Sequence, residues 1–257
     1  MKIALFSDIH ANMPALEAFF AHIETTKPDA IYCLGDLVGY NIWPNEVIQE
    51  IRKRGIPTIA GNYDFGVGRA SEDCGCAYKT EEDRVMGAQS IAFTNEIIKE
   101  KERKYLRTLP AHLQLEFQLN NDRLFLLLVH GSPRKINEYL FEDREEKSML
   151  RILETAHADL LFFGHTHKPY HRTFEYELEG QKAYRHAINI GSIGKPKDGD
   201  PRGCYVTLKV EEISSKFNKE SILVEFHRFS YDVEKAALAV ESSILPNAYA
   251  EMLRNGG

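Results

Sequence analysis

The stretch Ile3-Ala4-Leu5-Phe6-Ser7-Asp8-Ile9-His10 decides the fold, because a short apolar run is followed within four positions by an aspartate and a histidine. Apolar runs of this length predict buried strands. The same pattern, an apolar run that stops at a residue able to bind metal, recurs further along the chain. The other runs are Ala30–Leu34 before Gly35-Asp36, Ile56–Ala60 before Gly61-Asn62, Leu124–Val129 before His130-Gly131, and Leu160–Phe163 before Gly164-His165-Thr166-His167.

The ends of these strands predict a metal site. In open α/β sheets the ligand site lies outside the carboxyl ends of the strands, so we expect these aspartates, the asparagine and the histidines at one rim. Asp8 and His10 are two positions apart, which on an extended segment points both side chains the same way. The carboxylate of Asp36 has two oxygens and can bridge two ions. Mixed oxygen and imidazole ligands favour Mn, Fe, Zn, Co or Ni over Ca or a thiolate cluster.

Composition narrows the class of protein. The chain has 257 residues and a formal net charge of −6, with no basic excess that would indicate a nucleic-acid-binding surface. No stretch approaches the roughly 18 apolar residues of a membrane span, and the first residues do not resemble a signal peptide. Without an export signal, structural disulfides among the four cysteines are not expected. We therefore expect a cytoplasmic protein.

The first half of the chain alternates strand and helix patterns. Asn12 can cap a helix that continues to about His22, and Pro44 opens a second helix that Gly55 ends. This β-α-β-α-β order predicts parallel strands joined by right-handed crossovers. Residues 64–78, rich in Gly, Asp and Cys, predict a functional or mobile loop.

The remaining elements follow from periodicity and turn signals. After His167, paired segments predict antiparallel strands in a second sheet. No linker or repeat interrupts the chain, so we expect a single domain over residues 1–257. The expected elements are one or two helices over 80–107, a hairpin of Leu113–Leu119 and Leu124–Val129 across Asn120-Asn121-Asp122, a helix over 142–156, strand pairs Arg172–Glu177 with Ala183–Ile190 and Gly203–Val210 with Ile222–Ser230, and a final helix Val233–Ser243.

The complete motif series resembles one known family. The series Asp8-x-His10, Gly35-Asp36, Gly61-Asn62-x-Asp64, His130-Gly131 and Gly164-His165-x-His167 is similar to that of the calcineurin-like metallophosphoesterase superfamily. Within it, the chain looks like the small bacterial and archaeal branch of phosphodiesterases and diadenosine-tetraphosphatase-like enzymes. The resemblance covers nearly the whole chain. It implies an α/β fold, a four-layer αββα sandwich of two mixed β-sheets flanked by helices, with a dinuclear site at the sheet rims.

The resemblance also assigns roles to residues. It implies that one ion is held by Asp8, His10, Asp36 and His167, and the other by Asp36, Asn62, His130 and His165. It implies that Asp64 orients groups around the ligands, as carboxylates do for metal-bound histidines. Two divalent ions about 3.5–4 Å apart activate a bridging water and hold a phosphoryl oxygen. Mn is the first candidate for these ions, with Fe, Zn, Ni or Co as alternatives.

The third motif departs from the family pattern. Many members have a histidine after the asparagine, where it protonates the leaving oxygen, and this chain has Tyr63. A phenol has an ordinary pKa near 10, against about 6.5 for imidazole, so it is a weaker proton donor at neutral pH. Good leaving groups need less help, which favours phosphodiesters or nucleotide phosphoanhydrides as substrates. The alternative is that Tyr63 stacks on substrate or packs on the loop.

Four further residues are candidates for substrate or metal contact. Arg202 lies in a polar loop where a guanidinium can hold a phosphate oxygen, although a solvated loop is the simpler interpretation. Asn41 is close to Asp36 in sequence. Cys74 and Cys76 are weak evidence for a metal site, because a zinc site needs about four ligands. We interpret them as part of a loop.

These features predict a dinuclear-metal phosphoesterase that hydrolyses a phosphodiester or nucleotide phosphoanhydride by attack of a metal-bridging hydroxide. Asn62, Tyr63, Asp64 and His130 are the predicted catalytic residues. The expected partner is a small phosphorylated substrate, with a nucleotide and a homo-oligomer left open. The alternatives are a protein phosphatase and a non-catalytic scaffold that retains the fold.

Overall fold

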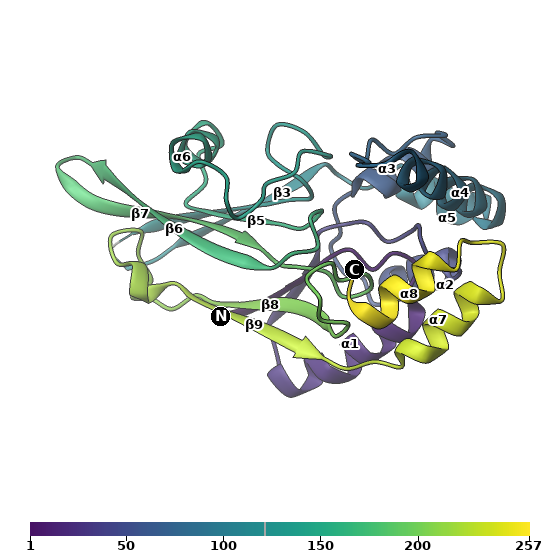
Figure 1. Ribbon diagram of the computed structural model, residues 1–257. Helices are drawn as coiled ribbons and strands as arrows, with labels where there is room; N and C mark the ends of the chain where they lie inside the picture. Colours follow the sequence, from purple (N-terminus) through teal and green to yellow (C-terminus); the bar gives the residue numbers. More distant parts are fainter. Residues whose placement is uncertain (121) are drawn as a thin grey trace.

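Two β-sheets pack face to face in the protein, for which a computed structural model describes residues 1–120 and 122–257 (Figure 1). One sheet has the strand order β2-β1-β8-β9 and the other the order β3-β4-β5-β7-β6. Each sheet mixes parallel and antiparallel pairs. The strands are β1 (Lys2–Phe6), β2 (Ala30–Cys33), β3 (His112–Gln118), β4 (Arg123–Val129), β5 (Leu160–Phe163), β6 (Tyr170–Leu178), β7 (Gln181–Asn189), β8 (Gly203–Lys209) and β9 (Leu223–Phe229).

Alternation along the strands builds the core. Successive side chains of a strand point to opposite faces of its sheet. Ile3 and Leu5 of β1 therefore pack between the two sheets, against residues such as Leu126 and Phe162. Phe6 faces the other way and joins a cluster with the helices. The apolar runs of β1, β4 and β5 are continuous because both of their faces are buried.

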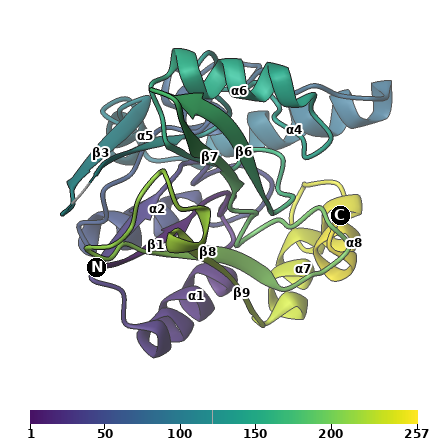
Figure 2. The ribbon, with the colours of Figure 1, turned by 90° about the vertical axis from the view of Figure 1, so that its left-hand side faces the viewer.

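Helices cover the outer face of each sheet (Figure 2). Helices α1, α2, α7 and α8 pack on the β1 sheet, and helices α3 to α5 join the same apolar cluster. Helix α6 packs on the β4 sheet. The result is the predicted four-layer αββα arrangement. The helices are α1 (Met13–Thr26), α2 (Pro44–Lys53), α3 (Asn62–Gly68), α4 (Glu81–Ile97), α5 (Glu100–Leu106), α6 (Glu146–Thr155), α7 (Val233–Glu241) and α8 (Ala248–Asn255), with a 3₁₀ turn at Lys219–Ser221.

Several local predictions are confirmed. The side chain of Asn12 accepts a hydrogen bond from the Ala15 amide (3.1 Å) and caps α1, which continues past His22 to Thr26. Strands β1 and β2 are parallel, and β3 pairs with β4 as a hairpin, although Asn121 of its turn lies outside the described residues. Among the described residues, no helix is both long and apolar enough to cross a bilayer.

Other predictions are wrong at positions where long-range contacts determine the secondary structure or the sheet to which a strand belongs. Residues 56–60 form only an isolated parallel bridge between Thr58 and Cys33, because Pro57 has no amide hydrogen to donate. Part of the predicted 64–78 loop is helix α3, whose first turn is capped by Asp64. The two late hairpins do not share one sheet, since β6 and β7 extend the β5 sheet while β8 and β9 extend the β1 sheet. Helix α8 was not predicted.

Candidate metal centre and the adjacent cavity

The loops after the strands carry the candidate ligands in an unusual backbone conformation. Asp8, His10, Asp36, His165 and His167 all have positive φ, between 49° and 64°. Residues other than glycine rarely adopt this region, and such strain gathers at functional sites. The prediction that Asp8 and His10 lie on an extended segment is therefore wrong. Their side chains converge because the loop turns back on itself, after β1 has ended.

Backbone hydrogen bonds hold this strained loop in place. The Asp8 amide donates to the Gly35 carbonyl (3.0 Å), and the His10 amide donates to the Asp36 carbonyl (2.9 Å). The loops after β1 and β2 are thus joined along their length. The carboxylates of Asp8 and Asp36 are brought together with a fixed separation, which side-chain packing alone would not impose.

The structure brings the predicted ligands into two buried groups. Asp8, His10 and His167 form one group, and Asp36, His130 and His165 form the other. In each group the candidate ligand atoms lie within 4.8 Å of one another. One oxygen of Asp36, Oδ2, lies 3.5 Å from Nε2 of His10 and 3.3 Å from Nε2 of His130, so it faces both groups. This is the position that a shared carboxylate would need.

The first group fits a cation. Nδ1 of His10 contacts the Val38 carbonyl (2.9 Å) and Nδ1 of His167 contacts the Lys195 carbonyl, so both Nδ1 atoms must donate. The two Nε2 atoms then carry lone pairs, yet they lie only 3.2 Å apart. Burial lowers the pKa of His10 to about 3 and that of His167 well below its usual range, which keeps both rings neutral. Two facing lone pairs repel unless a cation lies between them.

The second group also fits a cation. Nδ1 of His130 contacts the Leu34 carbonyl (2.8 Å), which aims Nε2 at Asp36 and at Oδ1 of Asn62 (3.1 Å). Burial opposes protonation of His130, but the Asp36 carboxylate outweighs it and raises the pKa of His130 to about 9. The proton occupies the place that a divalent ion would take. Nε2 of His165 is buried and has no hydrogen-bond partner among the described residues, and the same is true of Oδ1 of Asp8.

Asp64 supports the ligands through the backbone. Its carboxylate accepts hydrogen bonds from the amides of Leu37 (2.9 Å) and Gly61 (3.0 Å), which flank Asp36 and Asn62. Among the described residues its hydrogen-bond donors are backbone amides and not histidine rings, so it orients the loops that carry the ligands. Burial, together with the nearby Asp36 carboxylate, raises the pKa of Asp64 to about 7.

Gly61 is required by a close approach. A Cβ at this position would overlap Oδ1 and the amide nitrogen of Asp36. That oxygen of Asp36 accepts a hydrogen bond from the Tyr63 amide (2.9 Å), which leaves Oδ2 free to face the histidines. Any side chain at residue 61 would therefore displace the carboxylate that faces both groups.

Tyr63 lies behind the ligands instead of over them. Its side chain is 1% exposed, its ring packs edge-on against His10 (centroids 5.3 Å apart), and it closes over Gly39. The hydroxyl has no hydrogen-bond partner among the described residues. Burial, with Tyr40 close by, raises the pKa of Tyr63 well above its usual range. This placement favours the packing role over the proton-donor role.

The two predicted substrate contacts point elsewhere. Asn41 is buried and its amide donates to the His10 carbonyl (2.9 Å), so it supports the ligand loop. Arg202 pairs with Asp200 (2.7 Å) on the surface. Neither residue lines the cavity beside the ligands. Tyr40 and Lys195, from the same two loops, do line the cavity, so the side-chain contacts of Asn41 and Arg202 and not the course of their loops keep these two residues away from it.

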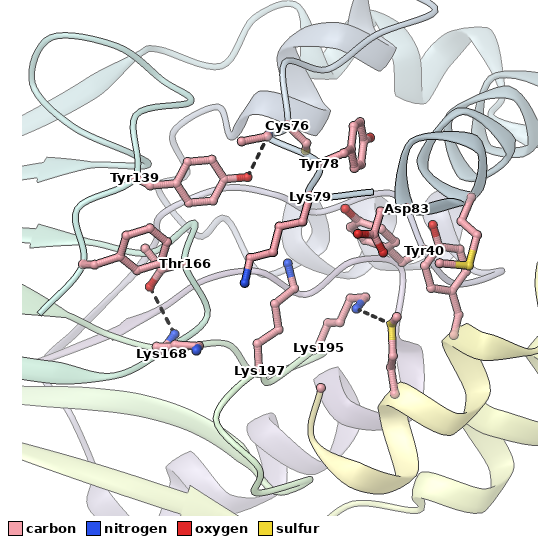
Figure 3. Close-up of a pocket in the computed structure, with 16 residues that line it drawn as sticks. Tyr40, Cys76, Tyr78, Lys79, Asp83, Tyr139, Thr166, Lys168, Lys195 and Lys197 are labelled. Carbon is pink, nitrogen blue, oxygen red and sulfur yellow. Dashed lines mark hydrogen bonds between the residues drawn. The ribbon is translucent and has the colours of Figure 1, made fainter. Parts of the chain in front are cut away.

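A cavity of about 470 Å³ opens beside the two groups (Figure 3). It reaches the ligands through Thr166, which lies between His165 and His167, and through Tyr139, whose ring centroid lies 4.1 Å from that of His165. Cys76 also lines it, with Sγ 3.4 Å from the Asn62 amide nitrogen. The four cysteines are free, and neither candidate metal group includes one.

Comparison with known proteins agrees with this geometry. The model of the calcineurin-like phosphoesterase superfamily domain matches residues 1–213. The chain belongs to this superfamily. The uncharacterized protein MJ0912 of Methanocaldococcus jannaschii is 33% identical over 262 residues, which cover 98% of this chain and 96% of that protein. UDP-2,3-diacylglucosamine hydrolase of Vibrio cholerae is 25% identical over 201 residues, covering 66% of this chain and 82% of that enzyme.

Solved structures show the same fold within this superfamily. The metallophosphoesterase of Sphaerobacter thermophilus aligns with a TM-score of 0.72 and 25% identity, covering 100% of this chain and 99% of its own. A hypothetical protein of Pyrococcus horikoshii, PH1004, aligns with a TM-score of 0.75 and 21% identity over 100% and 98% of the two chains. The fold class and the enzyme class, a metal-dependent phosphoric ester hydrolase, are thereby confirmed.

The cavity contains functional candidates that the sequence analysis missed. Four lysines and several aromatic rings line it, and of the lysines Lys195 and Lys197 lie in the polar loop that also carries Arg202. Lys168 directly follows His167 of the last ligand motif. Such proximity was the only available signal. Tyr139 and Tyr249 lie far from any motif.

Proposed function

We propose that the protein is a dinuclear-metal phosphoesterase that hydrolyses a phosphodiester or a nucleotide phosphoanhydride. The observation that carries the proposal is the position of Asp36 Oδ2, which faces both ligand groups at 3.5 Å and 3.3 Å from their imidazole nitrogens. Two divalent ions held here would activate a water molecule and neutralise charge on the phosphoryl group. Manganese remains the first candidate for both ions.

The ligand shells follow from the two groups. Asp8, His10 and His167 would hold one ion and His130, His165 and Asn62 the other, with Asp36 shared. Asn62 suits the second set because its Oδ1 lies 3.1 Å from Nε2 of His130 while its amide nitrogen is engaged by the Cys74 carbonyl (2.9 Å). The amide therefore presents oxygen to the site in a fixed orientation.

The remaining residues prepare the site for phosphoryl transfer. The carbonyls of Val38, Leu34 and Lys195 fix the tautomers of the three histidines they contact, so that each offers Nε2. Asp64 holds the loops that carry Asp36 and Asn62. Because Tyr63 is buried, its phenol is not placed to protonate a leaving group, which strengthens the preference for substrates with good leaving groups.

A matched pair of variants tests this function. Wild-type protein with Mn²⁺, Zn²⁺, Ni²⁺ or Co²⁺ should hydrolyse bis(p-nitrophenyl) phosphate, and Asp36→Asn should lose at least about 10²-fold in kcat. Asp143→Asn, a change of the same type on the exposed surface, should retain full activity. Absence of hydrolysis with every metal would sink the proposal and favour the non-catalytic scaffold. Preference for phosphoserine peptides over diesters would favour the protein phosphatase.

The other finer expectations rest on the sequence alone. The cytoplasmic location, the homo-oligomer and the single domain over residues 1–257 stay predictions.

A further inference from the structure

The cavity beside the metal centre carries a surplus of positive charge. Lys79, Lys168, Lys195 and Lys197 line it, and Asp83 is the one carboxylate side chain that does so among the described residues. Asp83 is already engaged, because its Oδ2 accepts a hydrogen bond from the Thr80 amide (3.1 Å) at the start of α4. Within residues 1–120 and 122–257, none of these four ammonium groups forms an ion pair with a carboxylate side chain.

Lys195 makes this charge hard to explain without a ligand. Its side chain is 3% exposed, and its ammonium lies over the faces of Tyr40 (4.8 Å to the centroid) and Tyr249 (5.6 Å). Among the described residues, the one polar contact of this ammonium is Sδ of Met252 at 3.4 Å. Burial, and then repulsion by Lys197, lowers the pKa of Lys195 well below its usual range. Buried charges in proteins are normally paired, and ring faces offset the cost only in part.

Two of the lysines converge on the same space. Figure 3 shows the side chains of Lys79 and Lys197 extending toward each other across the middle of the cavity. The ammonium of Lys197 also lies 5.9 Å from the ring centroid of Tyr40, on the side where Lys195 sits. Like charges that approach one another without a counter-ion are destabilising, and an anion between them reverses the sign of that interaction.

The opposite wall of the cavity is aromatic. The rings of Tyr139 and Phe141 stack, with centroids 5.6 Å apart and planes inclined by 15°. Tyr139 reaches back to His165, whereas Phe141 is 46% exposed at the mouth. An exposed phenylalanine beside a cavity presents a flat apolar face to an incoming planar group. The wall therefore leads from the metal centre outward.

We propose that this cavity binds the leaving side of the substrate, and that this side carries both an aromatic base and a second phosphate, as in a nucleoside diphosphate or a longer nucleoside polyphosphate. The second phosphate would be held by the lysines around Lys195, and the base would stack along Tyr139 and Phe141. A volume of about 470 Å³ lies within the range of small-ligand sites. The inference rests on the proposed function for the identity of the reacting bond.

Binding measurements on metal-free protein test this inference separately from catalysis. Calorimetric titration of EDTA-treated protein should show that AMP, which carries the base and the phosphate of the proposed leaving side, binds at least about 10-fold more tightly than either adenosine or inorganic phosphate, because a charge-assisted contact and a stacked ring are each worth about that much. Lys195→Met should abolish the difference between AMP and adenosine. Lys182→Met, which removes an exposed lysine on the distant β6–β7 hairpin, should leave it unchanged. Equal affinity for AMP and adenosine, or wild-type discrimination in Lys195→Met, would overturn the inference.

Two checks keep the result unambiguous. Lys195→Met should unfold at a temperature no lower than wild type, since it removes a buried unpaired charge, and Lys197→Met repeats the test if the first variant does not fold. The ratio of kcat/KM on ADP to that on bis(p-nitrophenyl) phosphate should fall at least about 10-fold in either variant. If AMP binds as predicted but no ester is hydrolysed, the proposed function fails while the nucleotide site stands. If the diester is hydrolysed without discrimination between AMP and adenosine, only this inference fails.

Discussion

Removing the hydroxyl of Tyr63 tests whether this residue donates a proton to the leaving group. In the part of the chain that the structure describes, the hydroxyl is buried without a hydrogen-bond partner, and an unpaired buried hydroxyl costs roughly 1–3 kcal/mol. The free energy of unfolding of Tyr63→Phe should therefore equal that of wild type or exceed it by up to that amount. The ring still packs against His10 and over Gly39, so the ligand loops should not move.

The activity of Tyr63→Phe carries the decisive comparison. General acid catalysis contributes typically 10²–10⁴-fold, so loss of a working proton donor would lower kcat by that factor. We expect kcat on bis(p-nitrophenyl) phosphate and on an alkyl phosphodiester to stay within about threefold of wild type, well below that contribution. Denaturant unfolding and steady-state kinetics on the same preparation measure both effects. A loss of about 10²-fold confined to the alkyl ester would refute the packing role.

Three further changes probe the metal centre. In the metal-free protein, the stability that protonated His130 contributes is fully present below about pH 6.5 and is lost as pH rises to about 9. Because a metal ion must displace this proton, metal affinity measured by titration should increase over the same pH window. Asp64→Asn places an amide against the Leu37 and Gly61 amides and should lower the free energy of unfolding by roughly 1–3 kcal/mol in denaturant titrations. Gly61→Ala should displace Asp36 and reduce bound metal measured by mass spectrometry.

Each of these has an outcome that contradicts it. Metal affinity that is flat between about pH 6.5 and 9 would mean that no proton leaves His130 on binding. Wild-type stability of Asp64→Asn would show that its two backbone hydrogen bonds are dispensable. Full metal content in Gly61→Ala would mean that Asp36 tolerates the added Cβ, and hence that its position is less constrained than the contacts imply.

The ligand set could be predicted from sequence because each ligand follows a local signal. Asp8, Asp36, His130 and His165 each come within two positions of the end of an apolar run that forms a strand or continues one. The order of these signals along the chain also identified the fold family, and with it the sandwich of two mixed sheets. The way in which the ligand side chains converge could not be derived from the sequence. It depends on positive φ values, which the residue types at these positions do not indicate.

Long-range packing accounts for the failures. The assignment of β6 and β7 to one sheet and of β8 and β9 to the other depends on which edge strand each hairpin meets, and hairpin patterning carries no information about that. Tyr63 follows a ligand in sequence, yet its side chain turns into the core. The cavity draws Lys79, Lys195 and Tyr249 from three distant segments, so no spacing rule connects them.

Metal stoichiometry tests the central claim most directly. Protein purified without chelators, loaded with Mn²⁺ and desalted, should contain about two ions per chain by elemental mass spectrometry, as a shared-carboxylate site requires. Asp36→Asn should fall to at most about one, because it weakens the ligand common to both groups, whereas Asp143→Asn should keep the full content. A wild-type protein that holds a single ion, or an Asp36→Asn variant that still holds both, would contradict the account.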